Sequence, residues 1–289
     1  MTGLCAAPGA FAFGKGYPPY LVASYGAVAR VNLPHSFYFN AAIYEDEPSL
    51  STVGHYGWPG EDWEFNKAKG ATIPIQLGYQ TTYANDPYPR SYDIGAFYDT
   101  MAYTDPLLNT LGQNRLVSGG SPKMDRGKSQ IWLQAEQVVW RPDMESQRGL
   151  DVFAGGNFTP SGEPNINNAF FVGFSMRGLF PERANDTINF EGQIINLNSR
   201  FTQSVNSEFD LRGLPQNAKG TESFVELNYG ISLAPGIVLK PFFQYIFNPD
   251  QSGIARPSPT NDHVVFAGGM VSISFPEALG LPRMPKPGT

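Results

Sequence analysis

Apolar residues recur at every second position in three runs between Phe224 and Phe275. Val225 and Leu227, for example, are separated by Glu226 and followed by Asn228. Period-2 alternation is typical of a β-strand that has one apolar face and one polar face. Three runs of this kind occur in the segment, and a tight turn at 234–236 (Ala-Pro-Gly) joins the first two. The segment therefore predicts three consecutive strands.

The same alternation recurs along the rest of the chain and predicts eleven strands in total. They cover Leu21–Val31, Ser36–Glu45, Ile73–Tyr83, Tyr92–Met101, Ser129–Trp140, Leu150–Phe158, Phe170–Arg177, about Thr187–Phe201, and the three runs within Phe224–Phe275.

The expected connections between these strands are alternately short and long. The short turns lie near Pro34, Pro87, Pro142, Pro181 and Pro235. The long loops begin near Asp46, Ala102, Thr159, Thr202 and Asn248. Outer-membrane barrels have short periplasmic turns and long extracellular loops. The rhythm therefore favours an all-β, transmembrane antiparallel barrel in which the last strand descends and Phe275 lies at the periplasmic rim.

Composition limits the alternatives. Only 16% of the residues are charged and 13% are aromatic, and no apolar run is long enough for a transmembrane helix. The net charge of −6 argues against nucleic acid as a partner, and the single Cys5 excludes an internal disulfide. We expect an irregular segment at 1–16, without the basic start of a signal peptide, a barrel region at 17–275, and a C-terminal extension at 276–289.

Several segments resemble the carbohydrate-selective porin family (OprB-type). They are Tyr92-Asp93-Ile94-Gly95-Ala96-Phe97-Tyr98-Asp99-Thr100, 133–137 (Leu-Gln-Ala-Glu-Gln), 178–181 (Gly-Leu-Phe-Pro), 226–229 (Glu-Leu-Asn-Tyr) and 239–249. The resemblance covers roughly Tyr17 to Phe275 and corresponds to the C-terminal two-thirds of the family. It implies a sixteen-stranded outer-membrane porin that passes sugars such as glucose by passive diffusion.

The resemblance also implies partners and an incomplete barrel. Carbohydrates would be the solutes, and outer-membrane lipid, lipopolysaccharide and the barrel-insertion machinery would be partners, together with a possible homo-oligomer. The family's N-terminal strands are missing, so we expect about 11–12 of 16 strands. Because an odd number of strands leaves two unpaired edges, we expect a C-shaped barrel that does not form a sealed pore by itself.

The sequence offers no catalytic, metal or cofactor motif. The segment Gly173–Arg177 lacks the second glycine of a nucleophile elbow, and the three histidines have no ligand spacing. The chain is therefore not expected to be an enzyme, and no cofactor is expected.

The polar residues that alternate with the apolar ones are the candidates for the lining of the pore. They are Asp93, Asp99, Gln134, Glu136, Arg177, Glu226, Lys240 and Gln244. Their charged and amide groups could bind sugar hydroxyls, with Trp132 and Phe97 stacking on sugar faces; alternatively they only hydrate the lumen or pair across strands.

The opposite face should contact lipid, with aromatic girdles at the interfaces. We expect Leu133, Val172, Phe174, Leu227, Phe243 and Ile273 to face lipid. Members of the girdles are expected among Tyr25, Tyr98, Trp132, Tyr245 and Phe275.

Two other functions fit the sequence. One is a barrel fragment, from a truncated gene, that transports nothing by itself. The other is a soluble β-sandwich that binds carbohydrate, which would be monodisperse without detergent.

Overall fold

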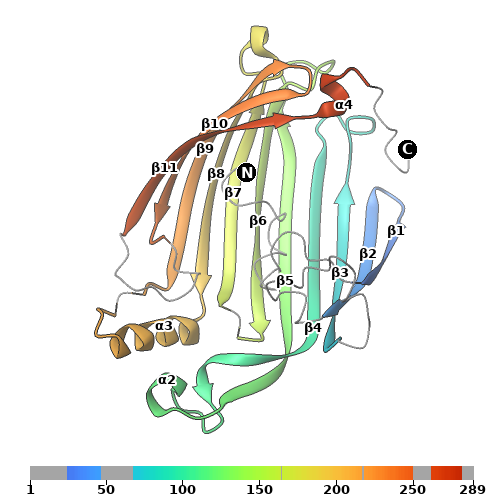
Figure 1. Ribbon diagram of the computed structural model, residues 1–289. Coiled ribbons are helices and arrows are strands. Elements are labelled where there is room, and N and C mark those ends of the chain that lie inside the picture. Colours follow the sequence, from blue (N-terminus) through green and yellow to red (C-terminus); the bar gives the residue numbers. More distant parts are fainter. Residues whose placement is uncertain (1–24, 47–67, 164, 217, 250–261, 282–289) are drawn as a thin grey trace.

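The computed structural model describes residues 25–46, 68–163, 165–216, 218–249 and 262–281 (Figure 1). In this described part, eleven strands form one antiparallel sheet, and each strand pairs with its neighbours in the sequence. The strands are β1 (Gly26–Asn32), β2 (Phe37–Asp46), β3 (Gly70–Gln80), β4 (Arg90–Asn109), β5 (Pro122–Trp140), β6 (Gly149–Ser161), β7 (Ile166–Arg177), β8 (Thr187–Leu197), β9 (Thr221–Ala234), β10 (Ile237–Phe247) and β11 (His263–Ile273).

The described strands make one sheet rather than two packed layers, so the β-sandwich interpretation is wrong. The sheet is strongly curved (Figure 1), and within the described residues its first and last strands, β1 and β11, each pair on one side only. No helix in the described part of the chain is long and apolar enough to span a bilayer.

All eleven predicted strands are present, but three of the predicted connections are wrong. The expected loop from Ala102 to Lys128 is largely a hairpin, because β4 continues to Asn109 and β5 starts at Pro122, with the short helix α2 (Arg115–Ser118) near its tip. The register shifts between Asp99 and Ala102, and again before Asn109. Such bulges interrupt the period-2 pattern, and this is why the alternation missed the outer half of the hairpin.

The other two corrections lie on either side of β7 and β8. β6 extends to Ser161 and β7 starts at Ile166, so the expected long loop after Thr159 is a short connection. β8 ends at Leu197, and helix α3 (Ser199–Leu211) replaces the end of the expected strand and most of the polar loop. The side chain of Asn198 caps this helix by accepting a hydrogen bond from the Arg200 amide at 2.8 Å.

The two faces of the sheet differ in character. Leu133 and Val172 are each 59% exposed, whereas Trp132, next to Leu133, is only 7% exposed. The exposed face carries the apolar residues of the alternating runs, including Leu227, Phe243 and Ile273. The opposite face carries the polar residues of the same runs, and the curvature of the sheet crowds them together.

The long-connection end of the sheet is covered in part by α3 and the β4–β5 hairpin. Arg200 of α3 pairs with Asp105 of β4 (2.6 Å) and with Glu163 (3.1 Å), and Phe201 packs against a buried cluster that includes Ile195. Asp105 is fully buried. Burial acts to raise the pKa of the Asp105 carboxyl, but hydrogen bonds from two backbone amides and the charge of Arg200 outweigh it and hold the pKa below its usual value.

The short turns at the other end are tied to one another. The Arg141 guanidinium donates to Pro87 O at 2.7 Å, and Arg148 Nε donates to Gly178 O at 2.8 Å. These bonds connect the β3–β4, β5–β6 and β7–β8 turns in sequence. The next tie is made by Asp186, which links the β7–β8 turn to β9.

The β9–β10 turn has the expected form. Gly236 adopts φ +73°, in the left-handed region that the turn requires and that glycine tolerates. Helix α4 (Phe275–Ala278) follows β11 beside this turn, where the Ser274 amide donates to Gly236 O at 2.7 Å. Phe275 is 68% exposed at this end. The expected segment 1–16 lies outside the described residues, as do Leu21–Ser24 of the first strand and 282–289 of the extension.

Candidate functional site

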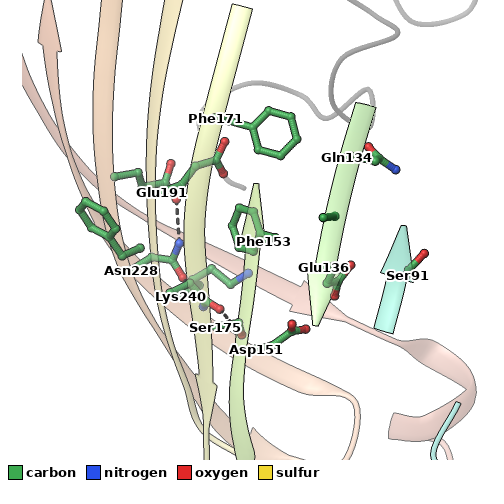
Figure 2. Close-up of a pocket in the computed structure, with 14 residues that line it drawn as sticks. Ser91, Gln134, Glu136, Asp151, Phe153, Phe171, Ser175, Glu191, Asn228 and Lys240 are labelled. Atoms are coloured by element: carbon green, nitrogen blue, oxygen red, sulfur yellow. Dashed lines mark hydrogen bonds between the residues drawn. The ribbon is translucent and has the colours of Figure 1, made fainter. Parts of the chain in front are cut away.

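A hollow of about 430 Å³ lies on the polar face of the sheet (Figure 2). Its lining starts at Ser91 on β4 and ends at Lys240 on β10, with contributions from every strand between them. A single cavity can touch seven adjacent strands only from the concave side of a curved sheet. The hollow is therefore on the inside of the arc, and the apolar residues are on the outside.

One wall of the hollow is a chain of side-chain hydrogen bonds across four strands. Ser175 Oγ donates to Asn189 Oδ1 (2.7 Å), and Asn189 Nδ2 donates to Asn228 Oδ1 (2.7 Å). Asn228 Nδ2 then donates to Glu226 Oε1 (2.8 Å), and Gln244 Nε2 donates to Glu226 Oε2 (2.6 Å). Asn189 and Asn228 each accept from one neighbour and donate to the next, and Gln244 donates from the other side, so this amide chain holds Glu226 in a fixed position.

Another wall is aromatic. Phe153 and Phe171 project from β6 and β7, with ring centroids 6.3 Å apart (Figure 2). Each ring lies over a glycine of the neighbouring strand: a Cβ at Gly155 would be 2.5 Å from the Phe171 ring, and a Cβ at Gly173 would be 2.5 Å from the Phe153 ring. The two glycines thus allow the rings to approach the backbone of the neighbouring strand closely.

The remaining polar groups of the hollow are mostly acidic. Glu136 of β5, Asp151 of β6 and Glu191 of β8 line it together with Glu226. Lys240 is the one basic residue among the described lining residues. An arrangement of carboxylates, amides and aromatic rings can bind hydroxyl groups and the C–H faces of a sugar ring.

The structure brings four of the eight candidate residues into this hollow: Gln134, Glu136, Glu226 and Lys240. The other four lie on the same face but outside the lining. Asp93 accepts from Trp132 Nε1 at 3.3 Å, and Gln244 is buried against Glu226.

Asp99 and Arg177 are the furthest from the expected role. Asp99 is only 2% exposed and accepts a hydrogen bond from the Met101 amide at 2.8 Å. Arg177 lies at the short-turn end of β7, where Nη1 donates to Gln147 Oε1 at 3.2 Å. Neither side chain points its polar group into the hollow.

Trp132 also differs from its expected place in an interfacial girdle. It lies on the concave face and packs against Phe97. A Cβ at Gly95, on the neighbouring strand, would be 2.1 Å from the Trp132 ring, so the glycine provides the space for the indole. Tyr98, in contrast, is 51% exposed on the outer face, as a girdle residue would be.

Ten lining residues were not among the eight candidates. Those with charged, amide, hydroxyl or aromatic side chains that matter for the hollow include Asp151, Phe153, Phe171, Ser175, Asn189 and Glu191. Their parity along each strand could have identified them, since Ser175 and Phe171 alternate with the apolar Phe170, Val172 and Phe174. The sequence did not predict that Phe153 and Phe171 face inward, because aromatic residues in barrel strands are ordinarily expected to contact lipid.

One curved antiparallel sheet, apolar outside and with a polar hollow inside, defines the chain as a wall of a porin-type β-barrel. The family model for "Carbohydrate-selective porin, OprB family" matches residues 2–275, and the chain belongs to this family. Porins are channels rather than enzymes, which agrees with the absence of a catalytic motif in the sequence.

Proteins similar to this chain include the following examples, all from bacteria. Porin B of Pseudomonas aeruginosa is 26% identical over 235 residues, and the putative porin QuiX of Acinetobacter baylyi is 25% identical over 239 residues; each alignment covers 79% of this chain and 51% of the relative. The high-pH structure of Pseudomonas putida OprB superposes with a TM-score of 0.76 at 23% identity, covering 89% of this chain and 60% of that one. The chain thus spans about half the length of the curated relatives that it matches.

Proposed function

We propose that this chain forms the sugar-conducting wall of a bacterial outer-membrane porin, and that its concave face is the path of the carbohydrate. The observation that carries the proposal is the hollow between the amide chain and the two phenyl rings. Fixed amides and carboxylates can replace the hydrogen bonds that sugar hydroxyls make with water, while Phe153 and Phe171 cover the apolar face of the ring. Family membership supports the same function. Glucose is the solute that we would test first.

Sugar binding tests the proposal. In ligand-observed NMR of the chain refolded in detergent micelles, glucose should bind weakly and reversibly. Replacing the inward ring (Phe171→Ala) should weaken binding several-fold, since it removes one face of the contact. The matched control is Phe170→Ala, which removes the 50% exposed ring of the preceding residue from the outer face and should leave the affinity unchanged. Equal effects of the two substitutions would contradict the assignment of the faces.

Whether the isolated chain conducts sugars is a different question from whether it binds them. For the isolated chain, the alternative function is a barrel fragment that transports nothing by itself. In the described residues, β1 and β11 each have one unpaired edge. Unpaired backbone groups in lipid cost several kcal/mol each, so an open sheet does not make a sealed pore. We expect planar-bilayer recordings of the purified chain to show no stable, uniform channels. Uniform channels that glucose blocks would refute the fragment interpretation.

We also propose that the partners are those of an outer-membrane barrel. The convex face carries exposed apolar residues from every strand, which suits contact with outer-membrane lipid. Lipopolysaccharide, the barrel-insertion machinery and further copies of the chain are proposed partners on the basis of the family. Folding into lipid vesicles, compared with precipitation in buffer without detergent, tests the lipid contact.

A further inference from the structure

The charges that line the hollow are unbalanced. Its described lining holds four carboxylates, those of Glu136, Asp151, Glu191 and Glu226, and one ammonium group, that of Lys240. Figure 2 labels all of these residues except Glu226. When all of these groups are ionised, the described lining carries a net charge of −3. The side chains of Glu136 and Asp151 are in hydrogen-bonding contact. A single proton shared between them would reduce the net charge only to −2.

The structure keeps this charge in place. Both carboxylate oxygens of Glu226 accept a hydrogen bond, one from Asn228 and one from Gln244, and these donors are neutral amides. The two amides hold the carboxylate in a fixed orientation on the wall of the hollow. Arg177, the basic residue expected in the lining, is at the rim and bound to Gln147.

The form of the hollow gives the charge a selective effect. The carboxylates come from β5, β6, β8 and β9, so they surround the space above the two phenyl rings rather than forming a cluster on one strand. A sugar that stacks on Phe153 or Phe171 presents its ring substituents to these groups. A positive substituent is then attracted by the lining and a negative one is repelled, most strongly at low ionic strength.

We propose that the hollow distinguishes carbohydrates by charge: it prefers amino sugars with a free ammonium group over neutral sugars, and it disfavours sugar acids and sugar phosphates. This inference rests on the proposed sugar-binding function and adds the chemical class of substrate to it.

The test compares three sugars of the same ring size and different charge. Glucosamine, glucose and glucuronate are titrated at pH 6 and low salt into the chain refolded in uncharged detergent micelles, and affinities are measured by ligand-observed NMR. We expect glucosamine to bind at least about threefold more tightly than glucose, and glucuronate at least about threefold more weakly. Both ratios should approach one at high salt, where the Debye length falls to about 3 Å.

Two substitutions in the lining should shift the preference in opposite directions. Glu191→Gln should reduce the ratio of glucosamine to glucose affinity, and Lys240→Gln should increase it. The matched control is Glu182→Gln, which removes the same charge from the turn between β7 and β8, outside the hollow, and should change neither ratio. Opposite shifts cannot come from a general loss of folding, which would lower all three affinities together.

The outcomes separate this inference from the proposed function. Glucose binding without any charge preference, or tighter binding of glucuronate, overturns the inference and leaves sugar binding intact. The failure of all three sugars to bind overturns the proposed function, and the inference with it.

Discussion

Asp186 is the clearest single support of the short-turn end, and its removal gives the sharpest stability prediction. Asp186 is 4% exposed, and its carboxylate accepts three hydrogen bonds. The donors are the Tyr229 hydroxyl (2.7 Å), Arg183 Nε (2.8 Å) and the Ser232 amide (2.9 Å). Tyr229 and Ser232 belong to β9, so this one side chain ties the β7–β8 turn to the next strand.

The substitution Asp186→Asn keeps the shape and removes the charge. An asparagine has one oxygen and one NH₂ group, so at least one of the three donors would face another donor. A hydrogen bond to a charged group contributes about 1.5–3 kcal/mol, and an unsatisfied buried donor costs about 1–3 kcal/mol. We therefore expect the free energy of unfolding to fall by about 2–4 kcal/mol at pH 7. The assay is urea unfolding of the chain folded into lipid vesicles.

The pH dependence provides a second check on the same side chain. Burial acts to raise the pKa of the Asp186 carboxyl, but the hydrogen bonds from Arg183, Tyr229 and Ser232 outweigh it and hold the pKa below its usual value. The stabilisation is therefore complete above the unfolded-state pKa of about 3.9 and is lost as the pH falls through the lower folded-state pKa. The difference between wild type and Asp186→Asn should persist from neutral pH down to about pH 4 and shrink below it.

The control for Asp186 lies in the turn between β5 and β6. Asp143 also accepts hydrogen bonds, but its donors, Ser146 and Glu145, belong to its own turn. Asp143→Asn should therefore destabilise the protein less than Asp186→Asn. If the two variants unfold at the same urea concentration, or if Asp186→Asn matches the wild type at pH 7, the inter-turn tie does not have the role assigned to it.

Further predictions concern the α3 end and the outer face. Arg200→Met should speed amide hydrogen exchange in α3 about tenfold or more, because it removes the guanidinium that pairs with the buried Asp105. The control Arg212→Met breaks an exposed pair with Glu208 and should change the exchange little. Similar exchange in both variants would contradict this prediction. Phe174→Arg should reduce folding stability in vesicles by about 2–4 kcal/mol if the residue lies near the midplane of the bilayer, and an unchanged stability would argue that this face does not meet lipid.

The period-2 pattern predicted the strands well because alternation reflects a physical requirement, namely that one face is apolar and the other polar. Leu133 and Gln134 show it directly, since they are neighbours in the sequence and lie on opposite faces. The pattern failed where the backbone departs from a regular strand. The bulges after Asp99 concealed the outer half of the β4–β5 hairpin, and α3 follows β8 without any break in polarity that alternation could detect.

The candidate site was less predictable than the fold. Alternation along a strand shows which face of the sheet a residue lies on, but it does not show which residues of neighbouring strands lie beside it. Gln134 and Glu226 both line the hollow because the register and curvature of the sheet bring these parts of β5 and β9 together. Asp99 is on the same face, but it is buried closer to the long-connection end of β4. Trp132 fits on the concave face because Gly95, its partner on the neighbouring strand, has no side chain. The sequence pattern of β5 alone could not show this contact.

The orientation of β5 in the membrane tests the central claim most directly. Cysteine is introduced at Leu133 or at Gln134 in a Cys5→Ser background, and each variant is folded into lipid vesicles. A water-soluble, membrane-impermeant thiol reagent should label Gln134→Cys rapidly and Leu133→Cys slowly, while brominated lipid should quench a fluorophore attached at position 133 and not one at position 134. Equal labelling and equal quenching at the two positions would contradict a lipid-facing outer surface and a water-filled, sugar-lining inner surface.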